Sequence, residues 1–280
     1  MKLFLCTKHD IVGSMMLNAI LPRLAPHHSI EVLLANRHRP EADVIPELQW
    51  MKFFEQDLPA QLLFPLLDAG AAGRLPAPAS PAAWLSFDAL SERHGVPITS
   101  VGHIARADVL TEHTQRVQPD LIVSFQFGFI FKPQALEIPR LGALNLHSGA
   151  LPHRAGVNPT FWCMKDGDRE VACTLHWIDQ GIDSGNVVDI RSMPLDYTKS
   201  FFSNWMTNYR QGADMICDAV ERLAAGDTLP SLPQDMSALQ YVPTPTPDDF
   251  KVFAERGRRM IDPQDYLDIV SRYLPRPEKG

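Results

Sequence analysis

The sequence contains few cysteines, and they lie far apart. Cys6, Cys163, Cys173 and Cys217 form no Cys-x-x-Cys pair, so neither a zinc knuckle nor a thioredoxin-type motif is indicated. Three of the four lie in apolar runs, where cysteine most simply acts as a small core residue. We therefore expect free thiols in a reducing, cytoplasmic setting.

Long hydrophobic runs are also missing. The N-terminus, "MKLFLCTKHD", has an apolar run that is too short for a signal peptide. No segment approaches the roughly 20 consecutive apolar residues that a membrane helix needs. The sequence therefore predicts no membrane partner.

The chain has no excess of positive charge. Its formal net charge is -7 and its pI is near 5.8. This balance disfavours a nucleic-acid partner, whose phosphates would demand many basic side chains. The hydrophobic fraction of 45% in 280 residues is ordinary for a globular protein of one large domain or two smaller ones.

Apolar runs of strand length alternate with helical patterns. The loop after the first run, "TKHDIVG", has one glycine and lacks both GxGxxG and GxxxxGKS/T, so NAD and ATP are not indicated. Alternating elements predict an α/β fold with an open, mostly parallel twisted sheet, Rossmann-like, whose ligands lie outside the carboxyl ends of the strands. The strands are expected at Lys2–Thr7, Ile30–Leu34, Pro97–Val101, Asp120–Phe125, Leu141–Leu146, Val171–Ile178 and Asn186–Ile190. Because only "DQGIDSG" separates the last two, they are expected to form a hairpin.

A change of composition near Ser200 suggests two parts. Residues 1–200 are expected to form the catalytic domain, and residues 201–280 a C-terminal extension with a long helix, Phe201–Ala225, and Pro-rich segments. We expect this extension to build the acceptor site or a dimer contact, so a homodimer is considered. In "YVPTPTPDDF" a helix should start at a cap on Thr246 or Asp248.

Polar side chains end one of the expected strands. In "LGALNLHSGALP", Asn145 and His147 are two residues apart, so they share a face of the strand. An amide can donate to a carbonyl oxygen as it becomes negative, and a histidine can move a proton near neutral pH. The missing carboxylate could come from Asp179 or Asp183 in "DQGIDSG", where Gly181 and Gly185 flank Asp183 and permit a tight turn.

These motifs resemble the formyltransferase family that uses 10-formyltetrahydrofolate. "NLHSGALP" and "TLHWIDQGIDSG" match its Asn-x-His, its nearby Leu-Pro and its Asp in a Gly-flanked loop. The resemblance implies the Rossmann-like formyltransferase fold and Asn145, His147 and Asp183 as catalytic residues. A substrate amine would attack the formyl carbon, Asn145 and protonated His147 would stabilise the oxyanion, and Asp183 would tune His147 and pass protons.

The resemblance also nominates binding residues. The folate pteridine would lie between "FQFGFIF" and "IDQGID", against Phe127, Phe129, Ile130, Asp179, Gln180 and Gly181. His153 and Arg154 would contact an anionic substrate, and His176 matches a further family histidine beside the site.

Plainer interpretations stay open for several of these residues. Asn145 and His147 could end a strand with satisfied hydrogen bonds, Asp183 could be a turn residue, and His176 a buried core histidine. The Phe side chains could be core, and His153 with Arg154 a solvated loop. The scattered His and Asp residues fit no helical metal motif, so no metal is expected.

Formylation of a small-molecule amine is the expected function. An amino sugar on a nucleotide carrier is the first choice of acceptor, and a hydroxyornithine-type precursor of a siderophore or antibiotic is the second. Methionyl-tRNA is disfavoured, because the residues after Ser200 show no basic strand pattern. A formate-releasing hydrolase is disfavoured because the strand at Lys2 leaves no room for the regulatory domain that precedes such enzymes. A folate-binding module without activity is a further alternative, against which the complete Asn145, His147 and Asp183 set argues.

Overall fold

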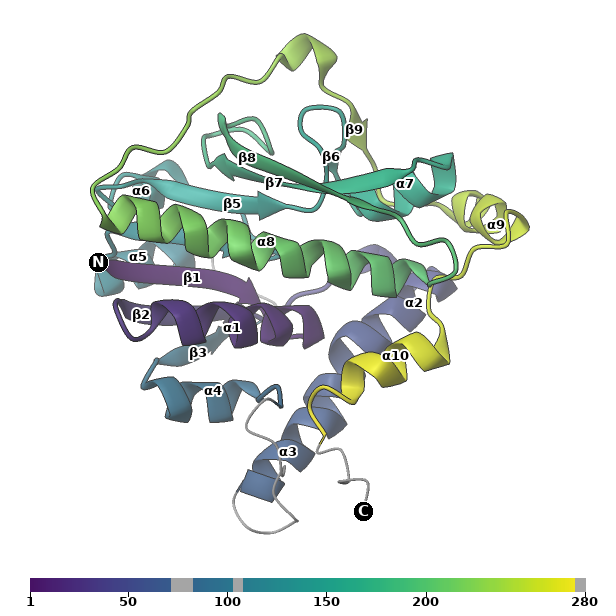
Figure 1. Cartoon of the computed structure of the whole chain (residues 1–280), viewed down its shortest axis with the longest axis horizontal. Coiled ribbons are helices and arrows are strands. Elements are labelled where there is room, and N and C mark those ends of the chain that lie inside the picture. The colour runs from purple at the N-terminus through teal and green to yellow at the C-terminus, as the bar shows by residue number, and fades with distance from the viewer. Residues whose placement is uncertain (72–82, 103–107, 275–280) are drawn as a thin grey trace.

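A seven-stranded sheet forms the centre of the molecule (Figure 1). The computed structural model describes residues 1–71, 83–102 and 108–274. The strand order is β3-β2-β1-β4-β5-β7-β8. The first five strands of this order are parallel, and β7 and β8 run antiparallel as a hairpin. In chain order the strands are β1 Lys2–Lys8, β2 Ser29–Ala35, β3 Ile98–Val101, β4 Leu121–Phe125, β5 Ala143–His147, β7 Glu170–Trp177 and β8 Val187–Pro194. Both the α/β class with a mostly parallel sheet and the hairpin are confirmed.

Helices cover both faces of the sheet. Figure 1 shows α1 (Ile11–Leu24) and α8 (Phe201–Ala224) side by side in front of the strands, with α5 (Val109–Val117) and α6 (Pro133–Leu136) behind them. Because both faces are covered, β1 and β4 are buried along their length and read as continuous apolar runs. The helix α4 (Phe87–His94) packs beside α1.

One unusual helical stretch crosses the carboxyl end of the sheet. The helix α2 (Pro46–Lys52) continues into two π-helical segments, η2 (Phe53–Asp57) and η3 (Pro59–Leu63), and then into α3 (Phe64–Ala71). A proline inside a helix lacks the N–H needed for the regular hydrogen bond, and wider π turns accommodate it. A short 3-10 helix, η1 (Pro40–Asp43), precedes this stretch.

The predicted boundary at Ser200 coincides with the N-cap of α8, where the Ser200 side chain accepts from Ser203 N. The apolar residues of α8 join the same core as β1 and β4. An extended segment follows, with η4 (Met236–Ala238) and the short strand β9 (Tyr241–Val242), which pairs with β6 (Ala155–Gly156). We keep the two-part division as a proposal about function, in which the residues after Ser200 serve the acceptor.

The C-terminal helices pack against the main domain. The helix α9 (Pro247–Glu255) begins at a capping box between Thr246 and Asp249, which confirms the predicted cap. Phe253 of α9 stacks on Phe161 of α7 (Pro159–Asp166). The helix α10 (Pro263–Val270) contributes Tyr266 to the core.

All four cysteines are buried free thiols, whereas the sequence predicted a core position for three of them. Among the described helices none has the length and apolar character to cross a membrane.

Candidate active site

Asn145 and His147 point to the same face of β5. Leu144 and Leu146 point to the opposite face, toward α8. The approach there is close, because a Cβ atom on Gly212 of α8 would lie 2.3 Å from Leu146 Cδ2. The tightly packed Leu residues therefore fix β5, and its period of two turns Asn145 and His147 the other way.

His176 lies beside Asn145 on the neighbouring strand β7. Asn145 Nδ2 is 3.0 Å from His176 Nε2, and His176 Nδ1 is 2.9 Å from the carbonyl oxygen of Trp177. A carbonyl can only accept, so Nδ1 carries the proton and Nε2 accepts from the amide. Burial lowers the pKa of His176, which favours this neutral form.

His147 is held from two sides. Its Nε2–H donates to the carbonyl oxygen of Arg154 at 2.7 Å. Its Nδ1 lies 3.6 Å from Asp183 Oδ2, close enough for an ion pair once the imidazole is protonated. The ring is 7% exposed, so its orientation is set by the protein.

Asp183 lies in the loop between β7 and β8, and its carboxylate faces His147 of β5 and His176 of β7. Its Oδ2 accepts from Gly156 N at 3.1 Å, and its Oδ1 lies 3.8 Å from His176 Nε2. Its backbone has a φ of +55°, a left-handed conformation that Asp tolerates better than most residues. The carboxylate therefore sits between two imidazoles.

A residue that the sequence did not single out holds this turn. Gln234 Nε2 donates to the carbonyl oxygens of Asp183 at 2.9 Å and Gly185 at 2.7 Å. Gly185 itself permits a tight hairpin, because a Cβ there would lie 1.8 Å from the carbonyl oxygen of Trp177.

Asp179 and Gln180 precede Asp183 in the β7–β8 loop, and their surroundings differ from those of Asp183. Asp179 Oδ1 accepts from Gly181 N at 2.9 Å and from Ser184 Oγ at 2.7 Å, so its side chain shapes the loop. Gln180 is exposed.

The aromatic segment after β4 divides between core and surface. Phe127 is 2% exposed and belongs to the core on the α5 side, while Phe129 lies under the Arg37 guanidinium at 5.1 Å. Ile130 is 72% exposed, and Ile182 in the β7–β8 loop, which the sequence analysis missed, is 57% exposed. Exposed apolar side chains on these two loops are suited to covering a planar ring system.

The two predicted substrate contacts, His153 and Arg154, have different surroundings. The Arg154 guanidinium forms ion pairs with Asp166 at 2.7 Å and Asp168 at 2.8 Å, and its contact with the site is through its backbone carbonyl. His153 is exposed. The structure therefore brings together Asn145, His147, His176 and Asp183, and leaves His153 apart.

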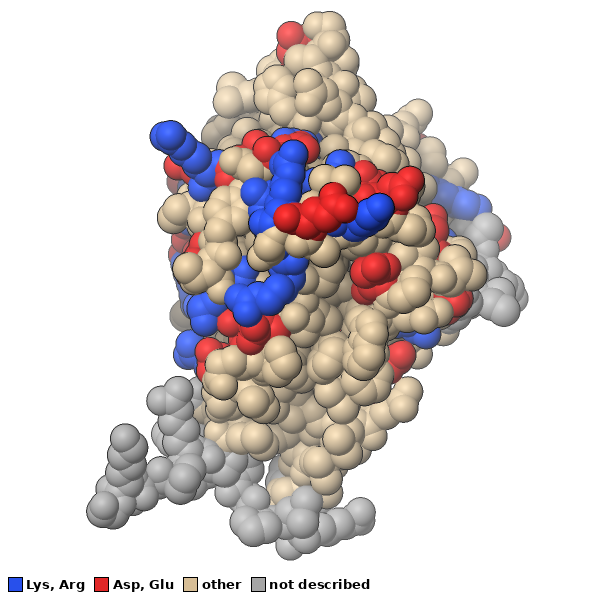
Figure 2. All heavy atoms as spheres, turned by 90° about the vertical axis from the view of Figure 1, so that its right-hand side faces the viewer, with Lys and Arg blue, Asp and Glu red and all other residues tan. Residues whose placement is uncertain are grey.

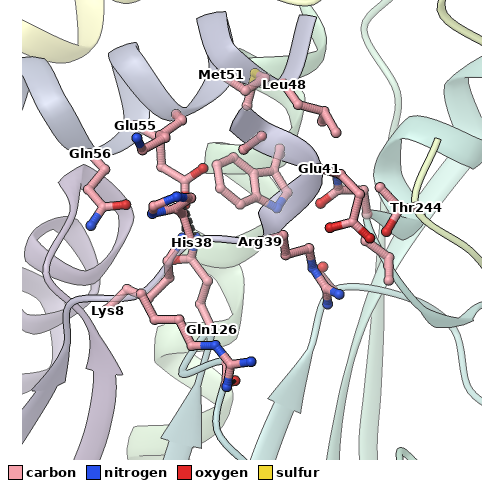
Figure 3. A pocket seen from close by; sticks show the side chains of 18 of the residues that line it. Lys8, His38, Arg39, Glu41, Leu48, Met51, Glu55, Gln56, Gln126 and Thr244 are labelled. Carbon is pink, nitrogen blue, oxygen red and sulfur yellow. Dashed lines mark hydrogen bonds and ion pairs between the residues drawn. The ribbon is translucent and has the colours of Figure 1, made fainter. Parts of the chain in front are cut away.

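A cavity of about 350 Å³ opens next to His147. Ser148, Trp205 and Tyr209 form part of its wall, and Thr244 of the segment after β9 contributes to its rim. Figure 3 shows further lining residues, among them Lys8 of β1, Glu41 of η1, Leu48 and Met51 of α2, Glu55 and Gln56 of η2, and Gln126 after β4. This is the carboxyl end of the parallel strands, where such folds bind ligands. Within the described ranges, no three His, Cys, Asp or Glu residues are grouped as metal ligands would be.

Comparisons with known proteins find similar formyltransferases. Residues 94–203 match a family model described as Formyl transferase. The methionyl-tRNA formyltransferase of Citrifermentans bemidjiense is 29% identical over 175 residues, which cover 62% of this chain and 54% of that protein. The chain thus spans about half the length of the curated relatives it matches.

Two solved structures share the fold. Glycinamide ribonucleotide transformylase 1 from Symbiobacterium toebii has a TM-score of 0.56 at 13% identity, over 82% of this chain and 93% of that chain. A sugar N-formyltransferase from a Shewanella species has a TM-score of 0.54 at 14% identity, over 99% of this chain and 89% of that chain.

Proposed function

We propose that this protein, whose residues 94–203 match the family model described as Formyl transferase, transfers a formyl group from 10-formyltetrahydrofolate to the amine of a small molecule. The observation that carries the proposal is the cluster of Asn145, His147 and Asp183, with His147 on the wall of a cavity.

In the reaction, the nitrogen of a neutral amine bonds to the formyl carbon, and the bond from that carbon to N10 of the folate then breaks. The amine loses a proton and N10 gains one. Asn145 donates its remaining N–H to the developing oxyanion, and protonated His147 adds a positive charge nearby. Asp183 pairs with His147 Nδ1 and helps the proton to move from the amine to the leaving nitrogen.

The donor is assigned to the loops after β4 and β7. The pteridine would lie against Ile130 and Phe129 on one side and against Asp179–Gly181 on the other. The exposed Ile130 and Ile182 support this assignment, because a flat heteroaromatic ring would cover both apolar surfaces.

An amino sugar on a nucleotide carrier is the acceptor we propose first, and an amine of the hydroxyornithine type is the alternative. The cavity of about 350 Å³ is within the range of small-molecule sites. The relatives that act on methionyl-tRNA make tRNA a further candidate. Against it, the described residues after Ser200 hold one two-residue strand, β9, and three α-helices, so they form no sheet of their own.

Titration calorimetry with the stable analogue 5-formyltetrahydrofolate tests the donor. Binding supports the proposal, and formyl transfer to a panel of amino-sugar nucleotides, hydroxyornithine and methionyl-tRNA then identifies the acceptor. If the purified chain binds no folate, the proposal fails.

A further inference from the structure

Two ionisable residues, Lys8 and Glu55, line the floor of the cavity beside His147, and Asp10 lies next to Lys8. Lys8 Nζ lies 2.6 Å from Glu55 Oε1 and 3.6 Å from Asp10 Oδ2. Asp10 is fully buried, and Oδ2 is one of the side-chain oxygens with no hydrogen-bond partner. Its other oxygen accepts from Gly13 N at 2.7 Å and caps α1.

Two amide oxygens on the same floor also lack partners. Gln56 is 6% exposed, and its Oε1 accepts no hydrogen bond, although its Nε2 donates to Asn36 Oδ1 at 2.7 Å. Gln126 Oε1 is unpartnered in the same way, while its Nε2 donates to Glu55 Oε1 at 2.8 Å. A buried oxygen without a donor costs free energy, so a ligand with N–H or O–H groups would be favoured here.

The π-helical turn explains how this floor arises. Glu55 and Gln56 are consecutive residues of η2, and both line the cavity. Figure 3 shows Glu55, Gln56, Lys8 and Gln126 gathered on one side of the space, with Arg39, Glu41 and Thr244 on the other. The cavity therefore has one side rich in hydrogen-bond acceptors, the floor, and an opposite side that includes Arg39.

Exposed basic side chains form the rim of the cavity. Arg37 and Arg39 are exposed, and both line the cavity together with His38, Lys52 and Glu41. Lys52 and His38 face Asp43, at 3.8 Å and 3.0 Å. Arg37 donates to the carbonyl oxygen of Gly128, and within the described residues no carboxylate pairs with Arg37 or Arg39. Figure 2, which views the carboxyl ends of the strands, shows Lys and Arg side chains gathered on this face with Asp and Glu beside them.

We propose that this cavity selects an acceptor with two features: N–H or O–H groups that donate to Gln56, Gln126 and Glu55 on the floor, and an anionic group that Arg37 and Arg39 bind at the rim. The inference rests on the proposed function, since it places the acceptor against His147. Arginine suits both phosphate and carboxylate. Thus the ligand class is a hydroxylated or amino compound with one of these anions.

The floor and the rim should both contribute to the selection of the acceptor. A floor of unpartnered acceptors rejects an apolar group, because the buried oxygens would then remain without donors. Trp205 and Tyr209, which are buried, add aromatic side chains to the wall of the cavity. An acceptor lacking either the hydroxyl or amino groups, or the anion, is therefore expected to bind weakly.

Calorimetry on the full chain tests the rim, with inorganic pyrophosphate, thymidine diphosphate and L-ornithine as probes. We expect at least one probe to bind, and Arg39→Gln to weaken its binding roughly tenfold. The matched control is Arg93→Gln, because Arg93 is exposed on α4 and does not line the cavity. Binding of pyrophosphate and thymidine diphosphate identifies a phosphate as the anion, and binding of ornithine alone identifies a carboxylate.

Formylation kinetics test the floor. Gln56→Leu removes one unpartnered oxygen, and we expect it to raise KM for the acceptor roughly tenfold or more without changing the Kd of 5-formyltetrahydrofolate. Gln61→Leu, an exposed position on the same helical stretch, should leave both unchanged.

The outcomes separate this inference from the proposed function. If 5-formyltetrahydrofolate binds but no probe binds, or if Arg39→Gln and Gln56→Leu match their controls, the inference is wrong and the proposed function stands. If no folate binds while a probe binds through Arg39, the anion site stands and the proposed function falls.

Discussion

Asn145 Nδ2 lies 3.0 Å from His176 Nε2, and this hydrogen bond determines how the Asn145 amide is presented. It uses one of the two N–H groups and leaves the other for a ligand. His176 can accept at Nε2 because its Nδ1–H is engaged with the carbonyl oxygen of Trp177. In the proposed reaction, His176 therefore acts through Asn145 as a positioning residue.

His176→Phe should lower kcat by about ten- to a hundredfold, somewhat less than the loss of an oxyanion donor itself. The ring keeps the core filled but accepts no hydrogen bond, so the Asn145 amide loses its orientation. His176→Gln restores an acceptor and should recover part of the activity. Steady-state kinetics of the two variants provide the check. A role in packing alone would leave them equally active.

Asn145→Ala should reduce kcat by roughly 10²–10³-fold, the value of one oxyanion-hole donor, while the protein stays folded. The half-buried amide makes one side-chain hydrogen bond, to His176, so its loss costs little stability. Circular dichroism and 5-formyltetrahydrofolate affinity are the controls. Activity like that of the wild type would remove Asn145 from the mechanism.

Asp183→Asn should lower kcat much more than it weakens folate binding. The amide can keep the hydrogen bond from Gly156 N, which is now 3.1 Å, but it loses the charge facing His147. Turnover and folate Kd are measured on the same preparation. Equal losses in both would assign Asp183 a structural role.

The sequence predicted the sheet well because its signals are local. Continuous apolar runs identify strands buried on both faces, and the short spacing "DQGIDSG" identifies the β7–β8 hairpin. The proximity of Asn145, His147 and Asp183 also followed from strand periodicity and the family motifs.

The features of the site that the sequence did not predict depend on contacts between distant segments. Lys8 meets Glu55, which is 47 residues away, through a π-helical turn that has no simple sequence pattern. Arg154 resembled an anion-binding residue, yet it pairs with Asp166 and Asp168. Asp166 is the last residue of α7 and Asp168 follows that helix, so no local pattern indicates the pairing.

The stability of the protein should depend on pH through Asp10. Burial raises the pKa of Asp10 to about 8, although Lys8 opposes this rise. The ordinary value is 3.8, so between these values the folded state binds a proton that the unfolded state has lost. Stability from this group therefore falls as pH rises from about 4 to 8, with a slope of at most about 1.4 kcal/mol per pH unit.

Asp10→Asn should remove that part of the slope. Asparagine can still cap α1 by accepting from Gly13 N. Urea unfolding of both proteins at several pH values between 4 and 8 gives the comparison, and titrating groups that do not interact with Asp10 cancel in the difference. Parallel curves for the two proteins would show that Asp10 is not protonated in the folded state.

Gly156→Ala should damage stability and turnover together, because Gly156 joins the C-terminal segment to the site. Its φ is +100°, and an added Cβ would lie 2.4 Å from the carbonyl oxygen of Val242. Its N–H donates to Asp183, so the displacement of β6 from β9 moves the carboxylate as well. We expect a loss of about 2 kcal/mol or more in the free energy of unfolding, which combines backbone strain with the steric clash.

Gly226→Ala provides the matched control for this experiment. Gly226 has a φ of +89°, but an added Cβ there meets no atom within 4 Å. The Gly226→Ala variant should therefore be destabilised only by backbone strain, about 1–2 kcal/mol. It should keep its kcat, since Gly226 lies just after the end of α8. Urea unfolding and kinetics on both variants separate strain from contact. If Gly156→Ala kept full turnover, the link from the segment after α8 through β6 to Asp183 would have no part in catalysis.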